Sequence, residues 1–188
     1  MTKEEGLPTQ GWSGNKIGEL KKCLSQLVLL EEQLAHQTKT TLLTNLTTRN
    51  LICDQAVTLA ADISLAACTA AWQSSVISPM ISRSLVKGLF LGLTETGQDL
   101  YSSAYLTMRS LMIGAVCGGA EPYPIAREGS QVILALTGEI GADKELIIKK
   151  LAEGALEADY SCPADERAVE KLFLELFEQI DHVTSSKH

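Results

Sequence analysis

The chain has 188 residues, of which 45% are hydrophobic and 21% are charged, a composition that predicts one folded domain with a core and excludes a disordered chain. Its net charge of −7 lies entirely in the last third, because residues 1–49 sum to +1, residues 50–120 to −1 and residues 121–188 to −7. This distribution argues against a nucleic-acid partner and against stable association with an anionic membrane surface, since both need clustered Lys and Arg.

We expect three parts: a flexible N-terminal arm over residues 1–13, a single helical domain over 14–183 and a short C-terminal tail over 184–188. The first segment has no apolar core of signal-peptide length, so we expect a cytoplasmic protein. The five cysteines form no close pair, which predicts reduced thiols in the core rather than disulfides or a zinc site. They are Cys23, Cys53, Cys68, Cys117 and Cys162.

The first predicted helix begins at Asn15, from which apolar residues recur at spacings of three and four up to Leu34. A Thr-rich patch over 38–48 follows, and its β-branched side chains weaken helix propensity without forbidding a helix. The chain either turns near Asn45 or Asn50 or continues as one long helix. The average length of helices slightly favours a turn.

The stretch Asn50–Ala120 has only seven charged residues in 71 positions, so its helices are expected to be buried. A helix over 51–77 carries a stripe of small residues that would let another backbone approach closely. The uncharged run Ile63–Ser82 has the length of a membrane span, but the polar side chains near its middle predict a helix buried against protein. The small-residue stripe comprises Ala60, Ser64, Ala67, Ala71 and Ser74.

The next helix is predicted to start at Ser78-Pro79, an N-cap followed by proline at the first helical position, and to end or kink near Gly97. Gly88 and Gly92 in this helix have the Gly-x-x-x-Gly spacing that indicates a close helix crossing. The amount of apolar helix surface also predicts a homo-oligomer. The small-residue stripe or the Leu85–Leu93 face is expected at or near its contact.

The second half of the chain continues with a helix over 99–117 that stops at Gly118-Gly119. The clearest break is the predicted loop over 118–127. Beyond it we expect a short helix over about 128–136, a turn over 138–141 and a helix over 143–157.

A last helix is predicted to start at Ser161-Cys162-Pro163. Its apolar face would consist of Val169, Leu172, Phe173, Leu176, Phe177 and Ile180. Because no segment alternates with the period of a strand, the sequence predicts an all-α bundle of about five to seven helices.

One candidate metal site comes from two similar segments, in which Glu32 and His36, and likewise Glu178 and His182, stand four residues apart. Two such helices together could supply two Glu and two His ligands. Bundles that bind metals with carboxylates space Glu and His three apart and add two further Glu, so we expect neither a metal nor another cofactor.

A candidate ligand site lies in the predicted loop over 118–127, where Glu121, Tyr123 and Arg127 could bind a small molecule on a rigid helical scaffold. The alternative is that this loop only connects two helices. The sequence has no Gly-x-Ser-x-Gly elbow and no phosphate-binding loop.

We therefore predict a non-catalytic helical interaction or scaffold protein that binds itself and possibly another protein. The competing hypothesis is an α-helical enzyme or ligand-binding protein with its site between the central helices and the loop over 118–127.

Overall fold

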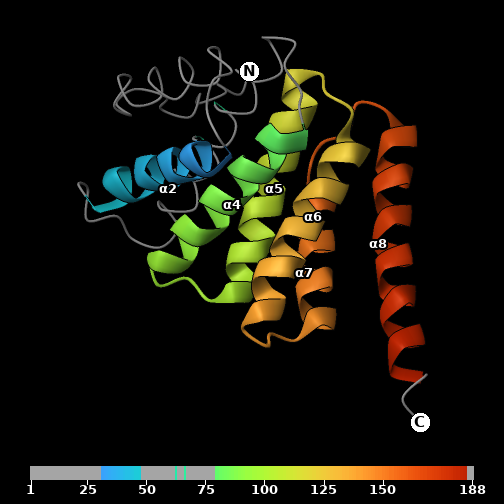
Figure 1. Ribbon diagram of the computed structural model, residues 1–188. Helices are drawn as coiled ribbons and strands as arrows, with labels where there is room; N and C mark the ends of the chain where they lie inside the picture. The colour runs from blue at the N-terminus through green and yellow to red at the C-terminus, as the bar shows by residue number, and fades with distance from the viewer. Residues whose placement is uncertain (1–30, 48–61, 63–65, 67–78, 186–188) are drawn as a thin grey trace, which may run out of the picture.

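The computed structural model of the chain describes residues 31–47, 62, 66 and 79–185, and these residues form six α-helices and no strand (Figure 1). The predicted all-α class is confirmed, and the described helices alone cover more than half of the chain. They are α2 (Glu31–Thr47), α4 (Pro79–Glu95), α5 (Leu100–Gly118), α6 (Pro122–Glu139), α7 (Lys144–Leu156) and α8 (Pro163–Ser185).

Several predictions fall outside the described residues: the helix before residue 31, the small-residue stripe, most of the uncharged run over 63–82 and the question of one or two helices over 14–77. Within the described ranges, none of the helices combines the length and the apolar character needed to cross a membrane.

Helices α2 and α4 cross closely at the two glycines of α4. A Cβ on Gly88 would collide with the backbone oxygen of Ala35, and a Cβ on Gly92 would lie 2.7 Å from Cδ2 of Leu42. The predicted close helix crossing is therefore confirmed. The Thr-rich patch, whose effect on the helix was left open, is helical up to Thr47.

The apolar face of α4 lies in the core of the chain itself. Leu85, Leu89 and Leu93 are each at most 2% exposed. The prediction that this face makes a subunit contact is wrong, because the same leucines already bury their side chains within one chain.

Helix α5 lies where the sequence predicts it and ends at the predicted pair of glycines. The Asp99 carboxylate accepts hydrogen bonds from the backbone N–H groups of Tyr101 and Ser102, which have no partner within the helix. At the other end Gly119 has a φ of 73°, in the left-handed region that favours glycine. Helix α5 then packs tightly on α7, where Gly154 lies against the backbone of Tyr105.

Helix α6 differs from the prediction, because it starts at Pro122 and not near Glu128. The predicted loop over 118–127 is reduced to a connection of three residues. Proline fits the first turn of a helix, since N–H groups there lack partners in any case. The far end also differs: Gly138 belongs to the helix, and Gly141, with a φ of 70°, makes the turn toward α7.

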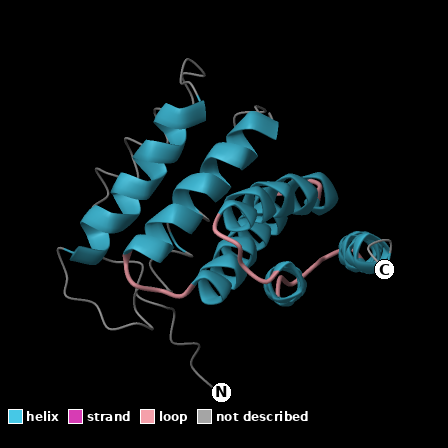
Figure 2. Cartoon of the chain, turned by 60° about the horizontal axis from the view of Figure 1, so that its bottom comes forward, coloured by secondary structure: helices cyan, strands magenta, loops and turns pink. Residues whose placement is uncertain are grey.

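Helices α6, α7 and α8 follow one another up and down the bundle, so that α6 and α8 run in the same direction (Figure 1). Helix α8 lies at the edge of the molecule and contacts only α6 and α7 among the described helices (Figure 2). Its predicted start at Pro163 is confirmed.

The predicted apolar face of α8 packs toward the core, with Val169, Leu172 and Phe173 buried. Cys117 and Cys162 are free thiols, as predicted, but they are exposed, so the prediction that they lie in the core is wrong. The other three cysteines lie outside the described residues.

Candidate functional site

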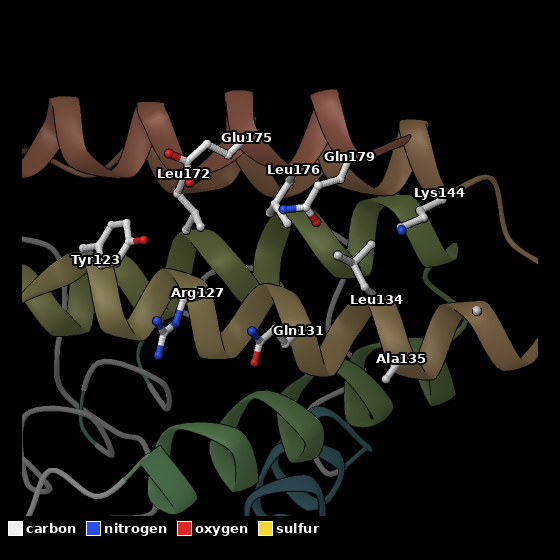
Figure 3. A pocket seen from close by; sticks show the side chains of 11 residues that line it. Tyr123, Arg127, Gln131, Leu134, Ala135, Lys144, Leu172, Glu175, Leu176 and Gln179 are labelled. Carbon is white, nitrogen blue, oxygen red and sulfur yellow. The ribbon is translucent and has the colours of Figure 1, made fainter. Parts of the chain in front are cut away.

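A groove with a volume of about 570 Å³ runs between α6 and α8 and is open on its solvent side (Figure 3). Helix α6 forms one wall, helix α8 the other, and the start of α7 adds one side chain. The lining residues are Tyr123, Arg127, Gln131, Leu134, Ala135, Gly138, Lys144, Leu172, Glu175, Leu176 and Gln179.

Three leucines form the apolar floor of the groove. Leu172 and Leu176 stand one turn apart on α8, and Leu134 comes from α6. Leu172 is buried, whereas Leu134 and Leu176 are half-buried, so the floor still offers apolar surface to a ligand. Amphipathic patterning produces this floor, because α8 turns its apolar face toward α6 and α7 and leaves the edge of that face uncovered.

Polar side chains line the α6 wall at the spacing of a single helical face. Tyr123, Arg127 and Gln131 follow each other at intervals of four residues, which places them one above another along the groove (Figure 3). Gln131 and Arg127 are exposed and Tyr123 is half-buried.

Two cations stand along the groove, Arg127 and Lys144. The Arg127 guanidinium lies 3.5 Å from the carboxylate of its neighbour Glu128, which also lies 3.6 Å from Arg83. Such surface ion pairs contribute little free energy, so Arg127 has donors left for a ligand. Lys144 has no ion pair within the described part of the chain. The only acidic lining residue, Glu175, lies on the α8 wall, 3.6 Å from Lys171.

Of the three residues in the predicted ligand site, the structure brings two to the groove. Tyr123 and Arg127 line it, whereas Glu121 precedes α6 as its N-cap residue, is exposed and does not line the groove. The sequence analysis assigned these residues to a loop. Both side chains are instead presented by the first two turns of a helix.

The residues of the candidate metal site do not come together in the described part of the chain. Glu32 and His36 are exposed on α2, which packs on α4 and has no contact with α8. Glu178 is exposed on α8, and the side chain of His182 lies outside what the structure describes. No group of three or more possible metal ligands occurs among the described residues.

The groove residues that the sequence analysis missed are Gln131, Leu134, Ala135, Gly138, Lys144, Glu175 and Gln179. Leu172 and Leu176 were recognised, but only as part of an apolar face. The interval of four residues from Tyr123 through Arg127 to Gln131 is a signal that could have found the α6 wall. The predicted loop interrupted this periodicity at Glu128.

Comparison of the sequence with protein-family models and with curated proteins finds no match. The function is therefore argued from the groove. Its lining combines apolar, amide and charged side chains and contains no Ser, Thr, Cys, His or Asp. This set is suited to binding an amphipathic surface.

Proposed function

We propose that this protein is a non-catalytic helical adaptor that binds an amphipathic α-helix in the groove between α6 and α8. The single observation that carries the proposal is the groove's pattern: an apolar floor of Leu134, Leu172 and Leu176 between walls of charged and amide side chains. Helix-in-groove recognition uses such a pattern, with apolar anchors inside the groove and polar contacts along its rims.

The dimensions of the groove suit a short helix. Its α6 wall extends from Tyr123 to Gly138, which corresponds to about 22 Å at 1.5 Å per residue. A bound helix of about fifteen residues would match that length. Because α6 and α8 run in the same direction, a helix bound antiparallel to both would also continue the up-and-down arrangement of the bundle.

The open side of the groove favours a helix over a small molecule. Small-ligand pockets bury most of the surface of their ligand, whereas this groove is open along one side. An amphipathic helix, by contrast, needs only its apolar face covered and keeps its polar face in water.

Charge defines which helix should bind best. Arg127 and Lys144 favour a partner with acidic residues at the edges of its apolar stripe. The probe is a synthetic helical peptide of about fifteen residues with Leu on one face. Two Glu residues, two turns apart, flank the leucines.

Fluorescence anisotropy with this labelled peptide tests the proposal. We expect saturable binding that weakens roughly tenfold in Arg127→Glu. Binding should recover when Lys replaces only the peptide glutamate opposite position 127, because that charge pair is then restored with opposite signs and the pair with Lys144 is kept. The matched control is Lys149→Glu, the same change of charge at an exposed position of α7 outside the groove. Absence of saturable binding, or equal binding by both variants, would contradict the proposal.

A further inference from the structure

A second unusual surface lies on α8, on its solvent side. Leu174 is 57% exposed, whereas the other large apolar residues of α8 from Val169 to Ile180 are buried or half-buried. Glu170 and Glu178 stand one turn before and one turn after it, and both are exposed. We call these three residues the outer α8 face.

The outer α8 face matches the groove in charge. Neither Glu170 nor Glu178 has an ion pair within the described residues, and eight residues of helix separate them by about 12 Å. In the groove, Arg127 lies toward the end where Tyr123 is found, and Lys144 lies toward the end where Leu134 and Ala135 are found (Figure 3). Two acids thus flank the leucine of the outer α8 face, and two cations, Arg127 and Lys144, line the groove. The cation nearest to Leu174 on α8, Lys171, is paired with Glu175.

We propose that the helix bound in the groove is α8 of a second copy of this chain, which inserts the outer α8 face. This inference rests on the proposed function of the groove and names its occupant. Leu174 would lie on the floor beside Leu134 and Leu176, while Glu170 and Glu178 pair with Arg127 and Lys144 in either order.

One chain can use both surfaces at the same time. Leu174 and Leu176 are two residues apart and so point about 160° away from each other around α8. Helix α8 also lies at the edge of the molecule, where no other described helix covers its outer side (Figure 1, Figure 2). The contact is therefore head-to-tail: the face of one copy enters the groove of the next, which produces a ring or an open chain of copies and not a two-fold dimer.

Two variants that each remove one half of the contact test this inference. Arg127→Glu disables the groove and leaves the outer α8 face intact, whereas Leu174→Asp disables the face and leaves the groove intact. By sedimentation velocity, the unaltered full-length chain should show masses that grow with concentration. Each variant alone should need roughly tenfold or more higher concentration to assemble than the unaltered chain.

The decisive sample is an equimolar mixture of the two variants. It should form a one-to-one heterodimer and grow no further, because only one working groove and one working face can meet. A mixture that stays monomeric, or variants that assemble like the unaltered chain, would overturn the inference. So would an unaltered chain that stays monomeric up to millimolar concentration.

Further variants keep the test independent of folding defects. Circular dichroism checks that each protein is folded. If Arg127→Glu does not fold, Lys144→Glu replaces it. If Leu174→Asp does not fold, the double variant Glu170→Lys with Glu178→Lys replaces it. Ile140→Asp is the control for Leu174→Asp, because Ile140 is 61% exposed and belongs to neither surface. Loss of assembly in this control would contradict the assignment of the outer α8 face.

The synthetic peptide separates failure of this inference from failure of the proposed function. If Leu174→Asp binds the peptide in its groove but the unaltered chain never assembles, the groove binds helices and α8 is not its occupant. If the peptide does not bind either, the proposed function itself is wrong.

Discussion

Gly154 of α7 lies directly against the backbone carbonyl of Tyr105 in α5, and the backbone nitrogen of Arg109 is 3.1 Å from where a Cβ would be. Backbone atoms, unlike the end of a flexible side chain, cannot move aside without shifting a helix. The close packing of α5 on α7 therefore depends on the absence of a side chain at this position.

We predict that Gly154→Ala destabilises the protein by about 2 kcal/mol or more, the size of an overpacked core, although alanine is the better helix former. The matched control is Gly138→Ala in α6, where a Cβ would meet nothing within 4 Å. This control should stabilise the protein by roughly 0.5 kcal/mol through helix propensity. Urea denaturation measures both, and equal effects of the two substitutions would show that α5 and α7 are not in such close contact.

The N-cap of α5 gives a pH-dependent prediction. Hydrogen bonds from the side chain and the backbone N–H of Ser102 lower the pKa of Asp99. A carboxyl whose pKa is lowered by folding stabilises the native state above its unfolded pKa, and this stabilisation is lost as the pH falls from about 4 through the folded pKa. Asp99→Ala should cost about 1 kcal/mol at neutral pH and almost nothing in strong acid.

Asp99→Asn is the informative companion, since asparagine also caps helices but does not titrate. It should retain most of the stability at neutral pH and flatten the acid dependence. Unfolding free energies measured from pH 7 down to pH 2 compare the three proteins. Parallel curves for all three would count against a capping role of the Asp99 carboxylate.

The contact between α5 and α7 also fixes the ionisation of Tyr105. The pKa of Tyr105 is raised to about 12. The main cause is burial, and the second is the hydrogen bond that its hydroxyl donates to Glu157 Oε2 at 2.5 Å. An acid whose pKa is raised by folding holds its proton in the native state after the unfolded chain has lost it. The protein should therefore lose stability as the pH rises from about 10, the ordinary pKa of tyrosine, toward 12.

The ultraviolet difference between the unaltered protein and Tyr105→Phe isolates this titration from that of the other tyrosines. We expect tyrosinate to appear well above pH 10, and to appear earlier in Glu157→Gln because the acceptor charge is removed. A Tyr105 that ionises at its ordinary pKa while the helices remain intact would argue against the contact with Glu157.

The ends of helices were the most predictable part of the fold, because they depend on local chemistry. Pro79, Gly119 and Pro163 mark observed boundaries of helices that sequence signals had indicated, and the helices predicted over 99–117 and 143–157 begin at the observed caps Asp99 and Asp143. A cap or a proline acts on the backbone groups next to it, so its effect does not depend on how distant parts of the chain pack.

The start of α6 and the groove were not predictable in the same way. Two prolines near two glycines resemble a loop, yet Pro122 and Pro124 both fall in the first helical turn, where no N–H partner is lost. The groove further requires that α6 and α8, which are separated by the whole of α7, lie beside each other in the same direction. Residues such as Gln131 and Glu175 are ordinary on their own helices and become a site only through this packing.

The central claim, that the groove between α6 and α8 binds an amphipathic helix, is tested most directly by mapping where the synthetic peptide binds. Amide chemical shifts of the full-length Leu174→Asp variant, titrated with the peptide, report on every helix at once. We predict changes on both walls, over residues 123–138 of α6 and 172–179 of α8, with little change in α2 and α4. Saturating peptide that leaves both walls unchanged, or changes confined to α2 and α4, would contradict the account.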